Sequence, residues 1–144
     1  MDLSALLAER AIERNIYAFA RAMDQRDWPN LQALLAPDAT ADFGAGEVAG
    51  RVEIVAYIGS FLDNCGATQH LIGNVVVDVD GDRATSLAYV SDMHLGTGAG
   101  SELFFTTLGE YRDDWVARDG SWLLQRRVKD NRATLGSMDV FAPS

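Results

Sequence analysis

The sequence contains a single cysteine, only two histidines and no block of lysine or arginine residues. Because Cys65 has no second cysteine to pair with, an intrachain disulfide and a disulfide-stapled secreted scaffold are excluded. Cys65 also has no Cys or His nearby at the spacing of zinc ligands. The sequence therefore carries no zinc signature.

Positive charge is scarce, because 12 Lys and Arg residues stand against 21 Asp and Glu residues, a formal net charge of −9. A nucleic-acid-binding protein needs a basic face to neutralise phosphates, so nucleic acid is not an expected partner. The N-terminus has no basic stretch followed by an apolar run, and no apolar stretch approaches the roughly 20 residues of a membrane helix. We therefore expect a soluble, cytoplasmic protein with no membrane partner, folded as one domain over residues 1–144.

The first half of the chain shows helical periodicity. Apolar residues recur at helical spacing over residues 8–23, which predicts a first helix. Asp27 is placed to cap a second, short helix over residues 28–35, and Pro37 would end it. A third helix is expected over residues 51–64.

The second half alternates apolar and polar residues, which is typical of strands. Strands are expected over residues 39–43, 68–79, 83–95, 102–116 and 122–130, the last four as two hairpins. The tail from Ala133 has little periodicity, so it either is mobile or covers the mouth of the fold. Three N-terminal helices before a long antiparallel sheet predict an α+β fold with the helices on one face. If the sheet curls around the helices, it leaves a cone where a small apolar ligand could bind.

The two histidines fall on the two strands of the first hairpin. If the chain turns at residues 80–82, His70 and His94 come within about one residue pair of direct opposition. A single histidine on a strand is more often a packed side chain than a catalyst, whereas two that meet can form part of an acid–base site. Two histidines and an aspartate could also hold a metal, but nothing in their spacing favours one.

Asp24 is the candidate carboxylate for this site. It follows Met23 at the end of an apolar helix face, where an unpaired carboxylate would be costly to bury. It either stays exposed at the helix end or points into the cone and meets His70. In the second arrangement the carboxylate fixes the tautomer of the imidazole and raises its basicity.

Several other side chains could contact a ligand. Arg126 shares its parity with Trp122 and Leu124, so it could hold an anion or a developing oxyanion, unless it lies at the sheet rim. Tyr17 is another candidate for polarising a carbonyl. The remaining candidates could equally belong to the core, and they are Phe43, Tyr57, Phe61, Met93 and Tyr111.

Four motifs resemble the SnoaL-like branch of the nuclear transport factor 2-like superfamily: residues 23–31 (MDQRDWPNL), 36–40 (APDAT), 68–70 (TQH) and 119–122 (DGSW). The resemblance extends over about residues 7–132. It implies a cone-shaped α+β barrel, in which a curved antiparallel sheet wraps three N-terminal helices. It also implies a buried Asp–His pair that works without a metal or an organic cofactor.

Asp24 and His70 match the two members of the family's pair, and His94 resembles the second pocket histidine of scytalone dehydratase. Met23 and Phe43 stand where that enzyme has two tyrosines that orient a water molecule. Gly109 and Tyr111 stand where it has a pocket serine and asparagine. The acid–base pair is kept while the substrate-polarising groups differ, so scytalone is not the expected substrate.

The resemblance favours a lyase or isomerase that acts on a small, largely apolar cyclic or polyketide-type substrate. His70, oriented by Asp24, would move the proton, and His94 would act as partner acid or hold the leaving group. A non-catalytic ligand-binding or subunit-like protein and a small epoxide hydrolase remain alternatives. A hydrogen bond between Asp24 and His70 beside a cavity lined by His94 would favour the enzyme. A homodimer through the outer sheet face is also implied, with possible contributions from Phe104, Leu108, Val116 and Leu123.

Overall fold

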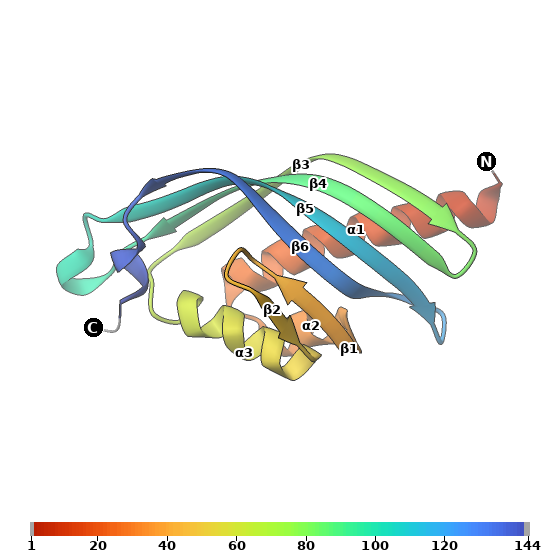
Figure 1. Ribbon diagram of the computed structural model, residues 1–144, viewed down its shortest axis with the longest axis horizontal. Helices are drawn as coiled ribbons and strands as arrows, with labels where there is room; N and C mark the ends of the chain where they lie inside the picture. The colour runs from red at the N-terminus through yellow and green to blue at the C-terminus, as the bar shows by residue number, and fades with distance from the viewer. Residues whose placement is uncertain (1, 143–144) are drawn as a thin grey trace.

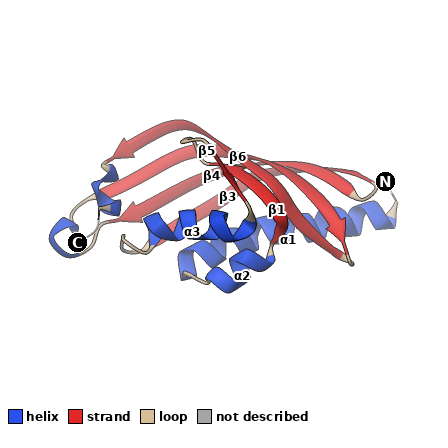
Figure 2. Ribbon diagram, turned by 60° about the horizontal axis from the view of Figure 1, so that its bottom comes forward, coloured by secondary structure: helices blue, strands red, loops and turns tan. Residues whose placement is uncertain are grey.

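The computed structural model describes residues 2–142 and shows three helices on one side of a single curved sheet (Figure 1; Figure 2). The helices are α1 (Leu3–Gln25), α2 (Trp28–Ala33) and α3 (Arg51–Leu62). The strands are β1 (Leu35–Asp42), β2 (Glu47–Ala49), β3 (Thr68–Asp80), β4 (Arg83–Leu95), β5 (Phe104–Arg118) and β6 (Ser121–Gly136). Two short 3₁₀ turns, η1 (Gly98–Gly100) and η2 (Met138–Phe141), follow β4 and β6. The predicted α+β class and the three N-terminal helices are confirmed.

The six strands form one open sheet in the order β2-β1-β6-β5-β4-β3. Strands β3 to β6 pair antiparallel with their neighbours, as predicted. Strand β1, however, runs parallel to β6, so the complete sheet is mixed and not antiparallel throughout. The chain reverses direction three times between β3 and β6, and β6 then lies beside β1 and runs in the same direction as β1. No local sequence pattern signals this pairing.

Pro37 does not end the second helix, as the sequence suggested, but lies inside β1. The helix stops earlier, at Ala33, and the strand begins at Leu35. The register between β1 and β6 shifts between Leu35 and Thr40. A proline has no N–H to donate to a ladder, so this irregular stretch is where a strand can accommodate it.

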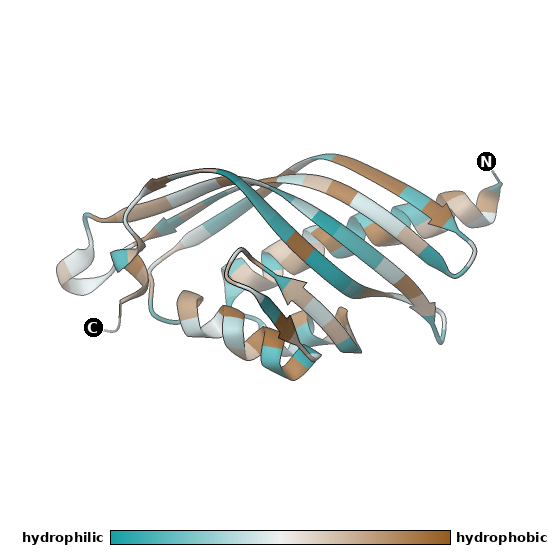
Figure 3. Cartoon of the chain, viewed as in Figure 1, coloured by the Kyte–Doolittle hydropathy of each residue, from teal (hydrophilic) through white to brown (hydrophobic). Residues whose placement is uncertain are grey.

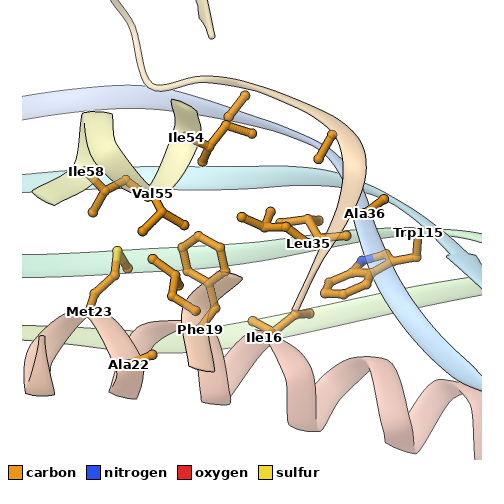
Figure 4. Close-up of a cluster of buried hydrophobic side chains, with 14 of the residues drawn as sticks. Ile16, Phe19, Ala22, Met23, Leu35, Ala36, Ile54, Val55, Ile58 and Trp115 are labelled. Atoms are coloured by element: carbon orange, nitrogen blue, oxygen red, sulfur yellow. The ribbon is translucent and has the colours of Figure 1, made fainter. Parts of the chain in front are cut away.

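The core forms between α1, α3 and the inner face of the sheet. Ile16, Phe19 and Met23 of α1 point toward Ile54 and Ile58 of α3, and all five side chains are buried (Figure 4). Hydrophilic and hydrophobic positions alternate along the long strands, as expected for a sheet with one face on a core (Figure 3). This packing fixes the C-terminal turn of α1, where Asp24 lies.

The C-terminal segment lies across one end of the cone. Strand β6 runs on to Gly136, and η2 then places Phe141 edge-on against Phe61, His94 and Phe105, with ring centroids 5.4, 5.0 and 5.8 Å away. The sequence left open whether the tail is mobile or covers the mouth of the fold. The described part of the tail covers the mouth. Within residues 2–142, none of the helices has the length and apolar character needed to cross a membrane.

Candidate active site

A cavity of about 350 Å³ lies between the helices and the strands β3 to β6. Six aromatic side chains line it: Phe43, Tyr57, Phe61, Phe105, Tyr111 and Phe141. Five polar side chains of the lining lie together and form its polar end: His70, Asp92, His94, Thr107 and Lys129. The size and the few convergent polar groups are typical of a small-molecule site.

Asp24 and His70 meet at this polar end. The Oδ1 atom of Asp24 lies 2.7 Å from Nδ1 of His70. The backbone N–H of His70 donates to Oδ2 of Asp24 at 3.0 Å, and the Thr68 hydroxyl donates to Oδ1 at 3.0 Å. Burial acts to raise the pKa of Asp24, but these hydrogen bonds outweigh it and hold the pKa below its usual value. An ionised Asp24 favours the imidazole tautomer of His70 with its proton on Nδ1, in which Nε2 carries the lone pair that can face a substrate.

Arg26 holds the two parts of this pair together. It ends α1 in the left-handed conformation, with a φ of 57°. Its guanidinium donates to the Thr68 hydroxyl at 2.7 Å, to the Gly66 carbonyl at 2.7 Å and to the Leu62 carbonyl at 3.1 Å. The end of α1 is thereby tied to the start of β3, which fixes the Asp24 carboxylate against the His70 ring.

His94 stands edge-on to His70, with ring centroids 5.6 Å apart. In the β3–β4 register Thr68 pairs with His94 and His70 pairs with Asp92, so the two histidines are diagonal neighbours, as the hairpin predicted. Nδ1 of His94 lies 2.9 Å from the Phe105 carbonyl, which requires a proton on Nδ1 and leaves Nε2 as an acceptor. Burial lowers the pKa of His94, and neither that carbonyl nor Asp92 reverses the shift. His94 is therefore neutral at pH 7.

The lowered pKa of His94 predicts a specific acid sensitivity. Below about pH 6.5 an unfolded chain binds a proton at this imidazole, whereas the folded protein does so only at a lower pH. The free energy of unfolding should therefore fall as the pH drops from 6.5 toward the lower folded pKa. Urea titrations of the wild type and His94→Gln between pH 7.5 and 5 check this, because the variant should show the flatter profile. Parallel profiles would contradict it.

Three cavity residues that the sequence reasoning missed form a hydrogen-bonded cluster. Asp92 is 2% exposed and accepts from the Thr107 backbone N–H at 2.9 Å, from its hydroxyl at 2.8 Å and from Lys129 Nζ at 2.8 Å. Burial acts to raise the pKa of Asp92, but the Lys129 ammonium and the hydrogen bond from Thr107 together outweigh it and keep the pKa below its usual value. Asp92 shares its inward parity with His94, so the alternation along β4 could have revealed it.

Ligand atoms of His70, Asp92 and His94 all lie within 4.8 Å of one another, which is the spacing of a possible metal site. Nδ1 of each histidine is engaged, so each Nε2 stays open to a ligand. Both oxygens of Asp92, however, already accept hydrogen bonds, and the Lys129 ammonium beside them would repel a cation. The charge of Lys129 therefore counts against a metal ion at this position.

Three predicted contact residues lie outside the cavity. The prediction that Arg126 points into the cone was wrong. The register of β6 shifts at Gln125, between the pairs Trp115–Leu124 and Asp114–Arg126, and this shift reverses which positions of β6 point inward. Arg126 is consequently half-exposed and lies 3.9 Å from Glu47. Tyr17 is exposed on α1 and donates to Glu13, and Met93 points outward from β4. The structure places Phe43, Tyr57, Phe61, His70, His94 and Tyr111 on the cavity, as expected.

Of the four residues suggested for an outer dimer face, two are exposed and two belong to the core or pack against it. Phe104 and Leu108 are 45% and 48% exposed, so they can contact a partner. Val116 belongs to the buried core and Leu123 packs against it, so these two suggestions were wrong. The homodimer itself stays a prediction.

An open curved sheet over three helices is the fold of the nuclear transport factor 2-like α+β proteins. Residues 4–128 match the SnoaL-like domain, and the chain belongs to this family. It is 32% identical over 120 residues to an uncharacterised protein of Mycobacterium tuberculosis. The match covers 82% of this chain and 81% of that one.

Two solved structures show the same fold. A candidate scytalone dehydratase from Novosphingobium aromaticivorans has a TM-score of 0.83 at 24% identity, covering 92% of this chain and 89% of that one. A hexachlorocyclohexane dehydrochlorinase from Novosphingobium barchaimii has a TM-score of 0.83 at 17% identity, and the match covers 95% of this chain and 94% of that one. At these identities the likeness extends to the fold alone.

Proposed function

We propose that this protein is a cofactor-independent lyase or isomerase for a small, largely apolar cyclic or polyketide-type substrate, with His70 as the base. The observation that carries the proposal is the 2.7 Å contact between Asp24 Oδ1 and His70 Nδ1 beside an aromatic cavity. A base of this kind contributes typically about 10²–10⁴-fold to a rate. The side chain of His70 is 5% exposed, so bulk water competes little for its proton.

The reaction begins with transfer of a proton from a substrate carbon to Nε2 of His70. The ionised Asp24 stabilises the imidazolium that forms. The electron pair of the broken C–H bond either expels a group from the adjacent carbon, which is a lyase reaction, or delocalises and is protonated elsewhere, which is an isomerisation. Nε2 of His94 can accept a hydrogen bond because Nδ1 faces the Phe105 carbonyl, so His94 suits holding a substrate hydroxyl better than acting as an acid.

The alternatives fit the geometry less well. A purely ligand-binding role would have left His70 without Asp24 or turned His94 out of the cavity. An epoxide hydrolase needs several acids and an arginine around one water, and Arg126 lies outside the cavity. Two proteins with this fold are described as a dehydratase and a dehydrochlorinase, names that denote elimination reactions. These points support the lyase or isomerase proposal.

Deuterium exchange at the α-carbon of simple ketones tests this proposal. The wild type is incubated in D₂O with cyclohexanone or with the bicyclic ketone 2-tetralone. It should exchange the α-protons of 2-tetralone at least roughly tenfold faster than buffer alone. Added 2-naphthol, a stable mimic of the enol, should inhibit by occupying the cavity. Exchange at the buffer rate for both ketones would contradict the proposal.

A further inference from the structure

The polar end of the cavity contains a cation that the Asp24–His70 pair does not use. Lys129 is the only lysine of the sequence, and among the described residues that line the cavity it is the only lysine or arginine. Its side chain is 11% exposed. Lysine is rarely buried to this degree unless it is paired, and Asp92 is its partner.

The fold makes room for this side chain and holds its end in place. Lys129 crosses from β6 over Gly109 of β5 to Asp92 of β4, and a Cβ at Gly109 would lie 3.2 Å from Cε of Lys129. Its Nζ donates to Asp92 at 2.8 Å and to the Thr107 hydroxyl at 2.7 Å. The ammonium is therefore fixed before any ligand enters.

An ammonium has three N–H donors, and Asp92 and Thr107 take two of those of Lys129. We propose that the third N–H of Lys129 binds a carbonyl oxygen of the substrate, and that the substrate of the His70 base is an uncharged, enolisable carbonyl compound. This inference rests on the proposed function and names its substrate class. Lys129 takes the role for which the sequence had suggested Tyr17 and Arg126, both of which lie outside the cavity.

The chemistry balances without any co-reactant. The α C–H bond breaks and its proton goes to Nε2 of His70. The electron pair forms a carbon–carbon double bond, and the carbonyl π pair moves to the oxygen, which becomes an enolate held by the Lys129 N–H. A preorganised donor at such an oxygen is typically worth about 10²–10³-fold in rate.

The charge of the cluster indicates why the substrate is uncharged. Asp92 is fully buried beside Lys129 and compensates its positive charge. An anionic substrate would meet no net positive field there, and it would lose its hydration among the aromatic walls. A neutral carbonyl loses little on entry, and its oxygen gains negative charge only as the proton leaves.

Because Lys129 is the only lysine, ¹⁵N-lysine labelling of the full chain gives one side-chain ammonium signal. We expect 2-naphthol to shift this signal on binding and naphthalene, which has the same shape without the oxygen, to leave it almost unchanged. The same shift should appear in His70→Gln, because binding of the oxygen does not need the base. If 2-naphthol binds in the cavity without moving the signal, the assignment of Lys129 is overturned while the role of His70 stands.

Binding to variants gives a second readout. In Lys129→Met the Kd of 2-naphthol should rise at least roughly tenfold, and that of naphthalene should change by less than about twofold. The double variant Asp92→Asn/Lys129→Met removes both charges together, so it keeps the comparison valid if the single variant folds poorly. An equal loss for both ligands, or for neither, would contradict the proposal, and the wild-type signal decides the question even if both variants fail to fold.

Discussion

Replacing Asp24 by asparagine is expected to slow α-proton exchange of 2-tetralone by about 10²–10⁴-fold and to leave the fold intact. The amide has the shape of the carboxylate, but its NH₂ group can face Nδ1 of His70, which lies 2.7 Å from Oδ1 in the wild type. Nδ1 must then accept, so the ring proton moves to Nε2 and the lone pair that takes the substrate proton is lost. The measurement is the exchange rate at saturating ketone, beside a circular dichroism spectrum.

The matched control is Asp119→Asn, the same chemical change in the turn between β5 and β6. Asp119 has a φ of 52°, a left-handed conformation that asparagine adopts readily, so this variant should keep the wild-type rate. In Asp24→Asn one hydrogen bond is lost, so the melting temperature should fall by only a few degrees. A wild-type exchange rate in a folded Asp24→Asn protein would refute the Asp–His mechanism.

Short segments of sequence place Asp24 and His70 on their elements, whereas the contact between the two was predicted from the family resemblance and not from the residues alone. Asp24 lies at the end of an apolar helix face whose packing fixes it, and His70 lies on a strand whose alternation fixes its side. The remaining link, the contact of α1 with the start of β3, is made by the Arg26 side chain. A side chain that satisfies carbonyls far along the sequence leaves no periodic pattern, so the sequence gives no sign of this role.

The Lys129 cluster and the buried Arg127 could not be read from alternation. One extra residue at Gln125 shifts the register of β6, so the inward positions pass from Leu124 to Arg127 and Lys129. A strict period of two instead predicts Arg126 inside. Whether a bulge forms there depends on the pairing with β5 and on the side chains that must be accommodated inside, and both are set by distant parts of the chain.

The parallel pairing of β1 with β6 was missed for a related reason. Hairpins are signalled by the turn residues between adjacent strands, as at the β3–β4 turn, whereas β1 and β6 are far apart in the sequence. Strand β1 is also short and contains Pro37, which weakens its alternation. Long-range contacts of this kind decide how the sheet curves, and with it the depth of the cavity.

Asp113→Ala is expected to destabilise the protein by about 3–5 kcal/mol, the largest loss of stability predicted for this chain. Both side chains of the Asp113–Arg127 pair are 1% exposed. The guanidinium donates to the carboxylate through Nε at 2.8 Å and through Nη2 at 2.9 Å. The ring centroids of Tyr111 and Phe19 lie 3.8 and 4.3 Å from the guanidinium carbon. Removal of Asp113 therefore leaves a charge buried among aromatic rings without a carboxylate to compensate it.

Urea unfolding at pH 7 measures this effect, with Asp114→Ala as the matched control. Asp114 is the exposed neighbour on the same strand, so its truncation should change the free energy of unfolding by less than about 0.5 kcal/mol. Equal losses in the two variants would show that the guanidinium does not stay buried in solution.

The double variant Asp113→Leu/Arg127→Met separates the stability of the pair from its effect on the cavity. Removing both charges should restore most of the stability, because an apolar pair of similar volume avoids the cost of desolvating two ions. Tyr111 lines the cavity on one side and stacks on Arg127 on the other. If the guanidinium orients this ring, the double variant should be stable and yet bind naphthalene and 2-naphthol several-fold more weakly, both to the same degree. A loss confined to 2-naphthol would instead trace to the Lys129 cluster.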